Sequence, residues 1–402
     1  MTRFVAHNSR IMKKYLVIGN GVAGTTAAEN IRQNDAKGEI TIVTDEDLPF
    51  YYRVRLPELL AGKVTESELI AKKKDWYHEN KILLKLQTKI TAADPAKKKV
   101  HIVTGESFVY DRLLLANGSK PFIPPIKGAD LQGVFTLHNI NDVRRISDEA
   151  GRTDKVILIG GGLLGLEAAY ALHKIGKKIT VVEFFPRLLP RQLDNEGAKR
   201  LQSYFERLGF SFRLGAKTRE IQGSKCAESV VLEDGAVLPA EMIILSAGVR
   251  PRLNLARMLD LHIDKGVIVN RYMQTSNPDI FAAGDVVEYD GRTYGIWPAA
   301  MEQGKIAGTN MSGGNLAYTG TVLSTILKVA GIDLASAGEI DENNHYPVKI
   351  VATNDIYKKV VMNDNRVIGC IMLGNMKNFR RINKAIASGE NILAELDFLL
   401  AS

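Results

Sequence analysis

The pattern of apolar and polar positions divides the chain into alternating strands and helices. An apolar run at residues 15–18 leads into a glycine-rich turn, a helix-compatible segment follows, and a β-branched run ends at Val43. Short apolar runs without strict alternation are typical of buried parallel strands, and this order of elements is that of a βαβ unit. The same order returns from Lys155 in KVILIGGGLLGLEAAYALHKIGKKITVVE. The sequence therefore predicts an α/β fold with two Rossmann-like domains.

The first turn carries Gly19, Gly21 and Gly24 in the spacing GxGxxG. In a dinucleotide-binding turn these glycines allow the tight turn, the close approach of a pyrophosphate and the packing of helix on strand. The diphosphate sits at the helix N-terminus, where free N–H groups and the helix dipole favour negative charge. Asp45 and Glu46 follow at the distance expected of a ribose-binding acid. A turn that binds no ligand is the alternative interpretation.

The second copy has the same spacing and also ends in an acid. Its glycines are Gly160, Gly162 and Gly165, and its acid is Glu183. Two complete copies favour ligand binding over a purely structural turn. A carboxylate at Glu183 can bond the ribose 2′-OH of NAD and would repel the 2′-phosphate of NADP, so we expect NADH. The basic residues Arg187 and Arg191 lie nearby and would instead favour the 2′-phosphate of NADP. Glu167 could stabilise the helix N-terminus or face a bound nicotinamide.

Three further strands are each followed by a small-residue turn. In YDRLLLANGSKP the strand meets Asn117-Gly118, AEMIILSAGVRPR contains Gly248, and in NPDIFAAGDVVE the strand leads to a turn with Gly284 and Asp285. A buried aspartate at position 285 suits the hydroxyl groups of a sugar or ribityl chain, and an N-cap is the alternative. From residue 319 the runs predict a small α+β domain.

Composition and charge exclude several classes of protein. The 402 residues predict two or three domains, and no apolar stretch is long enough to span a bilayer. We interpret residues 1–13 as a disordered extension or tag, because they lack the apolar core of a secretory signal. Two distant cysteines, Cys226 and Cys370, exclude a CxxC pair and suit a reducing cytoplasm. The net charge of +8 comes without a nucleic-acid-binding motif, so no nucleic-acid partner is expected.

These motifs together resemble the FAD-dependent pyridine nucleotide-disulfide oxidoreductase superfamily, with its glutathione-reductase-like fold. The resemblance implies an FAD-binding domain at 14–121 and 241–318, an NADH-binding domain at 122–240 and a small domain at 319–402. It implies FAD contacts from Gly19, Gly21, Gly24, Asp45, Glu46, Arg53, Asn117, Gly118, Gly284 and Asp285. It implies NADH contacts from Gly160, Gly162, Gly165, Glu183 and Gly248. Asn117 departs from the family pattern, which has threonine there.

The loop FYYRVRLPELLAGK decides between branches of the superfamily. The thiol-dependent branches carry a cysteine in this region, and here there is none. The loop is similar to that of NADH:rubredoxin reductases and of the flavoprotein part of NADH nitrite reductases, where a basic residue at the Arg53 position lies by the FAD. Arg53 and Lys328 are therefore candidates for tuning the flavin, although Lys328 also fits an ordinary surface lysine.

The resemblance implies hydride transfer from NADH to FAD and single-electron transfer to a small acidic iron protein, rubredoxin or ferredoxin. The short C-terminal domain favours a monomer. Two alternatives use the same fold and cofactors: an NADH oxidase that reduces oxygen, and a non-enzymatic redox sensor that binds FAD and NADH. A reductase serving an aromatic-ring dioxygenase would differ only in its partner.

Overall fold

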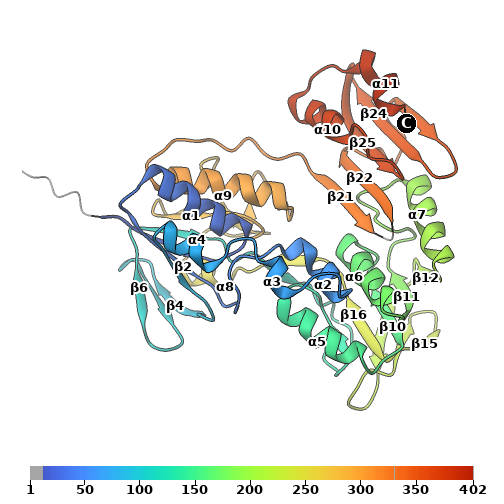
Figure 1. Ribbon diagram of the computed structural model, residues 1–402, viewed down its shortest axis with the longest axis horizontal. Coiled ribbons are helices and arrows are strands. Elements are labelled where there is room, and N and C mark those ends of the chain that lie inside the picture. The colour runs from blue at the N-terminus through green and yellow to red at the C-terminus, as the bar shows by residue number, and fades with distance from the viewer. Residues whose placement is uncertain (1–11, 330, 402) are drawn as a thin grey trace, which may run out of the picture. The chain divides into compact units, whose positions relative to one another are not determined.

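The computed structural model describes residues 12–329 and 331–401, which fall into two compact units (Figure 1). Unit 1 contains the residues up to Tyr51, Ile70–Lys120 and Pro251–Thr321. Unit 2 contains Tyr52–Leu69, Pro121–Arg250 and the residues from Val322 onward. The extension expected at 1–13 lies almost wholly outside the described residues. None of the described helices is long and apolar enough to cross a membrane.

Unit 1 is built on a five-stranded parallel sheet with the order β19–β7–β1–β2–β3. Its strands are β1 (Lys14–Ile18), β2 (Glu39–Val43), β3 (Ile82–Lys85), β7 (Arg112–Leu115) and β19 (Ile280–Ala282). Val17, Ile42 and Leu114 in neighbouring strands are fully buried, as in a sheet covered on both faces. Each neighbouring pair is parallel, so the carboxyl ends of the strands meet at one edge.

Helices α1 (Val22–Asn34) and α9 (Trp297–Met311) lie side by side in unit 1 (Figure 1). Small residues allow this close approach. A Cβ added to Gly304 would overlap the carbonyl oxygen of Ala23, and one added to Gly308 would overlap that of Ala27. Pro298 lies in the first turn of α9, where its missing N–H costs nothing. The pairing of α1 with α9 therefore fixes the helix that begins at the first glycine turn.

The other elements of unit 1 are short. They are α4 (Lys74–Glu79), β4 (Ile90–Asp94), β5 (Lys99–Ile102), β6 (Ser107–Val109), α8 (Asn254–Met258), β18 (Val267–Ile268) and β20 (Val287–Glu288). Strands β4, β5 and β6 pair antiparallel and form a small meander. The strand β8 (Ser119–Pro121) ends where the chain leaves unit 1.

Unit 2 contains a second five-stranded sheet with the order β12–β11–β10–β16–β9. The strands are β9 (Val134–Phe135), β10 (Lys155–Ile159), β11 (Lys178–Glu183), β12 (Ser211–Leu214) and β16 (Met242–Leu245). All of their pairings are parallel, as predicted for a second Rossmann-like unit. The helices are η1 (Arg53–Arg55), α2 (Leu56–Leu60), α3 (Glu66–Leu69), α5 (Ile140–Ala150), α6 (Leu163–Lys174) and α7 (Asn195–Arg207). Three antiparallel strands follow, β13 (Thr218–Gln222), β14 (Ser229–Leu232) and β15 (Val237–Pro239), and then β17 (Val249–Pro251).

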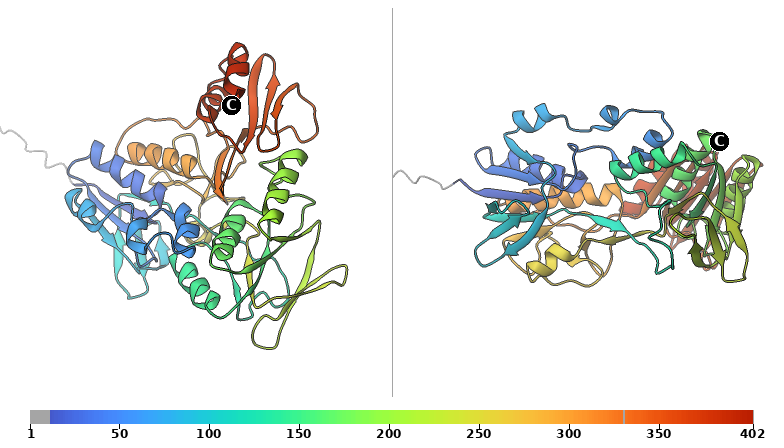
Figure 2. Two further views of the ribbon diagram at one scale, coloured as in Figure 1. Left: turned by 45° about the vertical axis from the view of Figure 1, so that its right-hand side comes forward. Right: turned by 90° about the horizontal axis from the view of Figure 1, so that it is seen from below.

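The C-terminal part of unit 2 is an antiparallel sheet with helices on one face (Figure 2), which confirms the predicted α+β domain. Its order is β21–β22–β25–β24–β23. The elements are β21 (Ser324–Val329), β22 (Ile332–Gly338), β23 (Val348–Ala352), β24 (Tyr357–Asn363), β25 (Arg366–Leu373), α10 (Phe379–Ser388), η2 (Leu393–Glu395) and α11 (Leu396–Leu400). Val360 and Cys370 of the sheet form a core with Phe379 and Ile382 of α10 and Leu396 of α11.

The units differ from the expected domains. The residues from Val322 onward, expected as a separate domain from residue 319, group with unit 2. Two boundaries also differ. The strand β16 pairs with β10 in the second sheet, and unit 1 resumes only at Pro251, so the boundary expected at 241 is too early. The segment Tyr52–Leu69 belongs to unit 2, although it interrupts unit 1 in sequence. Both differences arise from long-range contacts, because β16 pairs with β10 and α2 of the segment Tyr52–Leu69 packs on α5 and α6.

A buried ion pair joins the C-terminal sheet to the start of helix α7 within unit 2. Lys359 Nζ lies 3.2 Å from Asp194 Oδ2, and the Lys359 side chain is 2% exposed. Tyr357 Oη donates to the same oxygen at 2.7 Å. The other oxygen, Asp194 Oδ1, accepts the Gly197 N–H and caps α7. One carboxylate thus holds a helix start and two residues of β24.

We expect Asp194→Ala to lower the free energy of unfolding of unit 2 by about 3–5 kcal/mol, because it leaves a buried ammonium without its counter-charge. Loss of the helix cap adds to this effect. Urea unfolding followed by circular dichroism measures it. In Asp154→Ala, which removes an exposed pair with Lys177 at 3.8 Å, we expect a change of at most about 0.5 kcal/mol. Equal effects of the two variants would contradict the role given to Asp194.

Candidate functional site

The first glycine turn joins β1 to α1 and has the geometry of a phosphate-binding turn. Gly19 has a φ of +111°, and a Cβ added there would overlap the Ala116 carbonyl oxygen. A Cβ added to Gly24 would overlap the Gly19 carbonyl oxygen, so the helix packs directly on the turn. At Gly21, the N-cap of α1, an added Cβ would meet nothing within 4 Å. The turn therefore leaves open space at a helix N-terminus without a side-chain cap, which suits a diphosphate.

The turn after β19 reaches the same edge of the sheet. A Cβ added to Gly284, where φ is +84°, would lie 3.0 Å from the Cβ of Ala23 in α1. The Gly284 N–H donates to the buried Gln303 side chain of α9 at 2.9 Å. Asp285 Oδ2 accepts a hydrogen bond from Ser119 Oγ at 2.9 Å. The structure thus brings the turn at 284–285 against the helix that begins at the first glycine turn.

The turn after β7 contributes Asn117 and Gly118, with φ at Gly118 of +67°. Asn117 Nδ2 donates to the Arg252 carbonyl oxygen at 2.8 Å. Its Oδ1 is buried and has no hydrogen-bond partner among the described residues. Buried polar atoms are normally paired, so this oxygen is suited to a ligand group that donates a hydrogen bond.

Both carboxylates expected at the ribose already have a side-chain partner. Arg252 Nη1 lies 3.2 Å from Asp45 Oδ2, and Arg252 Nε also donates to the Ser119 carbonyl oxygen at 2.9 Å. Tyr51 Oη donates to Glu46 Oε2 at 2.6 Å. A carboxylate can accept several hydrogen bonds, so these contacts leave capacity for a ribose hydroxyl. Arg252, which no sequence motif indicates, links Asp45 to the turn after β7.

The second glycine turn, between β10 and α6, repeats the first in each respect. Gly160 has a φ of +107°, and a Cβ there would overlap the Ser246 carbonyl oxygen. At Gly162, the N-cap of α6, an added Cβ would meet nothing within 4 Å. A Cβ at Gly165 would lie 2.8 Å from the Gly160 oxygen. Gly248, with φ of +95°, follows the neighbouring strand β16. Unit 2 therefore contains a second open glycine turn at a helix N-terminus without a side-chain cap.

Glu183 ends β11 and is 6% exposed. Its carboxylate accepts the backbone N–H of Gly161, inside the glycine turn, and that of Phe185 at 2.8 Å. These two bonds hold the carboxylate against the turn where a ribose would lie. Glu183 is thus part of the framework of the turn as well as a candidate ligand.

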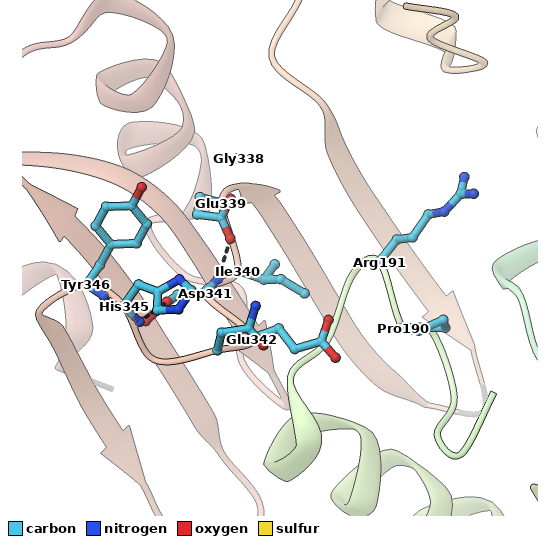
Figure 3. Close-up of a pocket in the computed structure, with 10 residues that line it drawn as sticks. Pro190, Arg191, Gly338, Glu339, Ile340, Asp341, Glu342, His345 and Tyr346 are labelled. Carbon is cyan, nitrogen blue, oxygen red and sulfur yellow. Dashed lines mark hydrogen bonds between the residues drawn. The ribbon is translucent and has the colours of Figure 1, made fainter. Parts of the chain in front are cut away.

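The two arginines that follow Glu183 differ in their contacts. Arg187 Nη1 lies 2.7 Å from Glu342 Oε1, and Arg187 Nη2 donates to the Pro190 carbonyl oxygen at 3.1 Å. Arg191 has no such partner among the described residues and lines a pocket of about 480 Å³ beside residues 338–343. Figure 3 shows its side chain extending away from Glu342. The Arg187 guanidinium is thus already neutralised, which weakens its case as a binder of a 2′-phosphate.

Arg53 and Glu167 both belong to unit 2, where α2 packs on α6. Arg53 Nη1 donates to the His138 carbonyl oxygen at 3.0 Å. Burial, with a smaller contribution from the Glu58 carboxylate, raises the pKa of Glu167 to about 7. The first turn of α6 contains no acid, and Glu167 lies in the second turn, so an interaction with the helix N-terminus loses support. Lys328 lies in β21, and its side chain is outside the described residues.

The remaining candidate groups are thiols and metal ligands. Cys370 is buried, which raises the pKa of its thiol to about 12, and Cys226 is exposed with its Sγ 3.6 Å from Gln132 Oε1. Among residues 12–329 and 331–401 no cluster of three or more His, Cys, Asp or Glu residues could hold a metal ion. Neither thiol neighbours a glycine turn in sequence.

Two regions of the chain match known protein families. Residues 13–304 match the family described as pyridine nucleotide-disulphide oxidoreductase. Residues 324–390 match the rubredoxin NAD+ reductase C-terminal domain.

Proteins of similar sequence cover nearly the whole chain. A nitrite reductase [NAD(P)H] of Bacillus subtilis is 36% identical over 94% of this chain and 48% of its own length, so the chain spans about half of that protein. An NADH-rubredoxin oxidoreductase of Clostridium acetobutylicum is 31% identical over 96% of this chain and 98% of its own length. The crystal structure of the NADH:rubredoxin oxidoreductase from the same organism aligns with a TM-score of 0.80 at 31% identity, covering 97% of this chain and 99% of that one.

The raised pKa of Glu167 predicts a pH dependence of stability. The carboxyl ionises near 4.5 when unfolded and near 7 when folded, so the folded state binds more protons between these values. Its contribution to the free energy of unfolding is therefore present below pH 4.5 and lost as pH rises to 7. We expect Glu167→Gln to gain about 1–3 kcal/mol relative to the wild type between pH 5 and pH 8.

Urea unfolding at pH 5, 6, 7 and 8 measures this difference. Glu58→Gln is the control, since the Glu58 carboxylate is the lesser cause of the shift, and it should leave most of the pH dependence in place. A constant difference between wild type and Glu167→Gln across the pH range would contradict the assignment.

Proposed function

Because the chain belongs to the pyridine nucleotide-disulphide oxidoreductase family, we propose that it is an NADH-dependent flavoprotein reductase that delivers electrons to a small iron protein, rubredoxin or ferredoxin. The observation that carries the proposal is the combination of two open glycine turns, one in each unit, with a C-terminal segment that matches the rubredoxin NAD+ reductase domain. The NADH-rubredoxin oxidoreductase of Clostridium acetobutylicum supports it by its similarity over nearly its whole length.

The residues of unit 1 fit FAD. Gly21 leaves the backbone approach to the diphosphate open, and the orphaned Asn117 Oδ1 can accept a hydrogen bond from the cofactor. Asp285, oriented by Ser119, would accept hydrogen bonds from hydroxyl groups of the cofactor. Glu46, held by Tyr51, remains the candidate for the ribose. FAD bound there would supply the conversion of a two-electron hydride into single electrons.

The residues of unit 2 fit NADH. The open N-terminus of α6 suits its diphosphate, and the Glu183 carboxylate suits the 2′-OH of its ribose. Binding energy from this remote half of NADH would hold the nicotinamide for transfer. Glu167 would contact the nicotinamide end, where its pKa near 7 makes it a donor or an acceptor according to pH. Arg53, which the resemblance places by the flavin, would tune its potential through charge.

The proposed partner is acidic, and the enzyme acts as a cytoplasmic monomer. With a net charge of +8, the chain would steer a negatively charged carrier into contact. Association of this kind weakens as salt screens the charges.

We expect steady-state NADH oxidation to be fastest with rubredoxin or ferredoxin in a panel that also contains nitrite, oxygen and free flavin. For the iron protein, we expect kcat/KM to fall by about tenfold or more between 20 and 300 mM salt, because screening removes the steering. Reduction of free flavin serves as the salt control. Faster reoxidation of the NADH-reduced enzyme by oxygen than by either carrier would make it an NADH oxidase. Binding of FAD and NADH without turnover would make it a redox sensor.

We expect Glu183→Ala to raise the KM for NADH by about tenfold or more, since it removes a charged acceptor of the ribose hydroxyl and loosens the turn at Gly161. The ratio of flavin to protein absorbance should stay at the wild-type value. The exposed carboxylate of Glu233 provides the control variant Glu233→Ala, which should leave both quantities unchanged. Loss of FAD from Glu183→Ala would reverse the assignment of the two units.

A further inference from the structure

Asn20, between Gly19 and Gly21, carries an unused hydrogen-bond donor inside the first glycine turn. The residue is 8% exposed, and its Nδ2 is buried without a hydrogen-bond partner among the described residues. A buried amide nitrogen without an acceptor is costly, so such groups are rare unless a water, ion or ligand completes them. Beside it, the space at Gly21 is open and α1 begins without a side-chain cap.

The carbonyl oxygen of the Asn20 side-chain amide accepts hydrogen bonds from two hydroxyl groups. Tyr77 Oη donates to Asn20 Oδ1 at 3.0 Å, and Thr25 Oγ1 donates to it at 3.3 Å. Burial raises the pKa of Tyr77, so its hydroxyl stays protonated and keeps its donor role at neutral pH. Tyr77 Oη also accepts the Phe50 N–H at 3.1 Å. With its oxygen occupied, the amide can offer only its Nδ2–H groups to the turn.

We propose that Asn20 Nδ2 donates a hydrogen bond to the diphosphate of the dinucleotide bound at the first glycine turn, and that Tyr77 is the positioning residue that orients it. The proposal rests on the proposed function, in which that dinucleotide is FAD. It adds a side-chain donor to a site otherwise formed by backbone N–H groups and the dipole of α1. A donor to a phosphate oxygen is charge-assisted and is therefore stronger than a neutral pair.

The chemistry of the amide gives two variants that separate this proposal from a structural role. Asn20→Ala removes the donor. Asn20→Asp keeps the shape and the acceptor for Tyr77 and Thr25 but replaces the donor with a negative charge beside a diphosphate. If Asn20 only holds Tyr77 in place, Asn20→Asp should bind FAD like the wild type and Asn20→Ala should bind it more weakly. If Asn20 donates to the diphosphate, Asn20→Asp should weaken FAD binding more than Asn20→Ala does.

The experiment uses the full chain, with FAD removed and then titrated back while flavin fluorescence reports binding. We expect Asn20→Ala to raise the Kd for FAD by about 10- to 100-fold, and Asn20→Asp to raise it further. Tyr77→Phe, which leaves the ring against Trp76, should raise it by about three- to tenfold. Asn34→Ala, an exposed amide at the other end of α1, should match the wild type.

Melting temperatures of the FAD-free variants serve as the folding control and should stay near the wild-type value, while the rise produced by saturating FAD shrinks in proportion to the lost affinity. If Asn20→Ala or Asn20→Asp binds FAD within twofold of the wild type, the proposal for Asn20 is wrong and the proposed function stands. If the wild type itself does not bind FAD, the proposed function is wrong.

Discussion

The close packing of a helix start on a strand end is the constraint on which both units depend. At Gly24 and Gly165 an added Cβ would press on the carbonyl oxygen of Gly19 or Gly160, so each helix touches the turn that precedes it. This contact directs the uncapped N–H groups of α1 and α6 toward the open space at Gly21 and Gly162. The packing that fixes each helix therefore also leaves its first N–H groups without a side-chain cap, which is the arrangement that the proposed diphosphate sites require.

The sequence predicted the elements around these turns because their signals are local. Apolar runs, glycine spacing and a following acid lie within some 30 residues of one another, and each constrains the others. The sheet joined by β16 could not be predicted in this way. ILSAGVRP and LLLANGSKP have the same local pattern, yet β16 pairs with β10 in unit 2 and β7 pairs with β1 in unit 1. Only the pairing of distant strands distinguishes them.

The same limit applies to the candidate site. Sequence spacing found the acids at positions 45, 46 and 183 but not the groups that hold them. Asp45 is held by Arg252, which lies 207 positions away, and Glu183 by backbone N–H groups that no residue identity reveals. The GxGxxG spacing gives no role to Asn20, which occupies an x position, because its unpaired donor exists only in the folded turn. Spacing thus identifies where a charge lies, whereas its capacity to bind is set by tertiary contacts.

The thiols of the chain bear on where electrons could go after a hydride arrives. A thiol reacts as the thiolate, and burial raises the pKa of Cys370 to about 12, so it stays protonated at neutral pH. Cys226 lies between β13 and β14, in a turn that contributes no residue to either glycine turn. Neither thiol adjoins the glycine turns or the turn at 284–285 in sequence. In the proposed function, electrons would leave the flavin for a separate acceptor without passing through a thiol of this chain, so the identity of that acceptor would define the reaction.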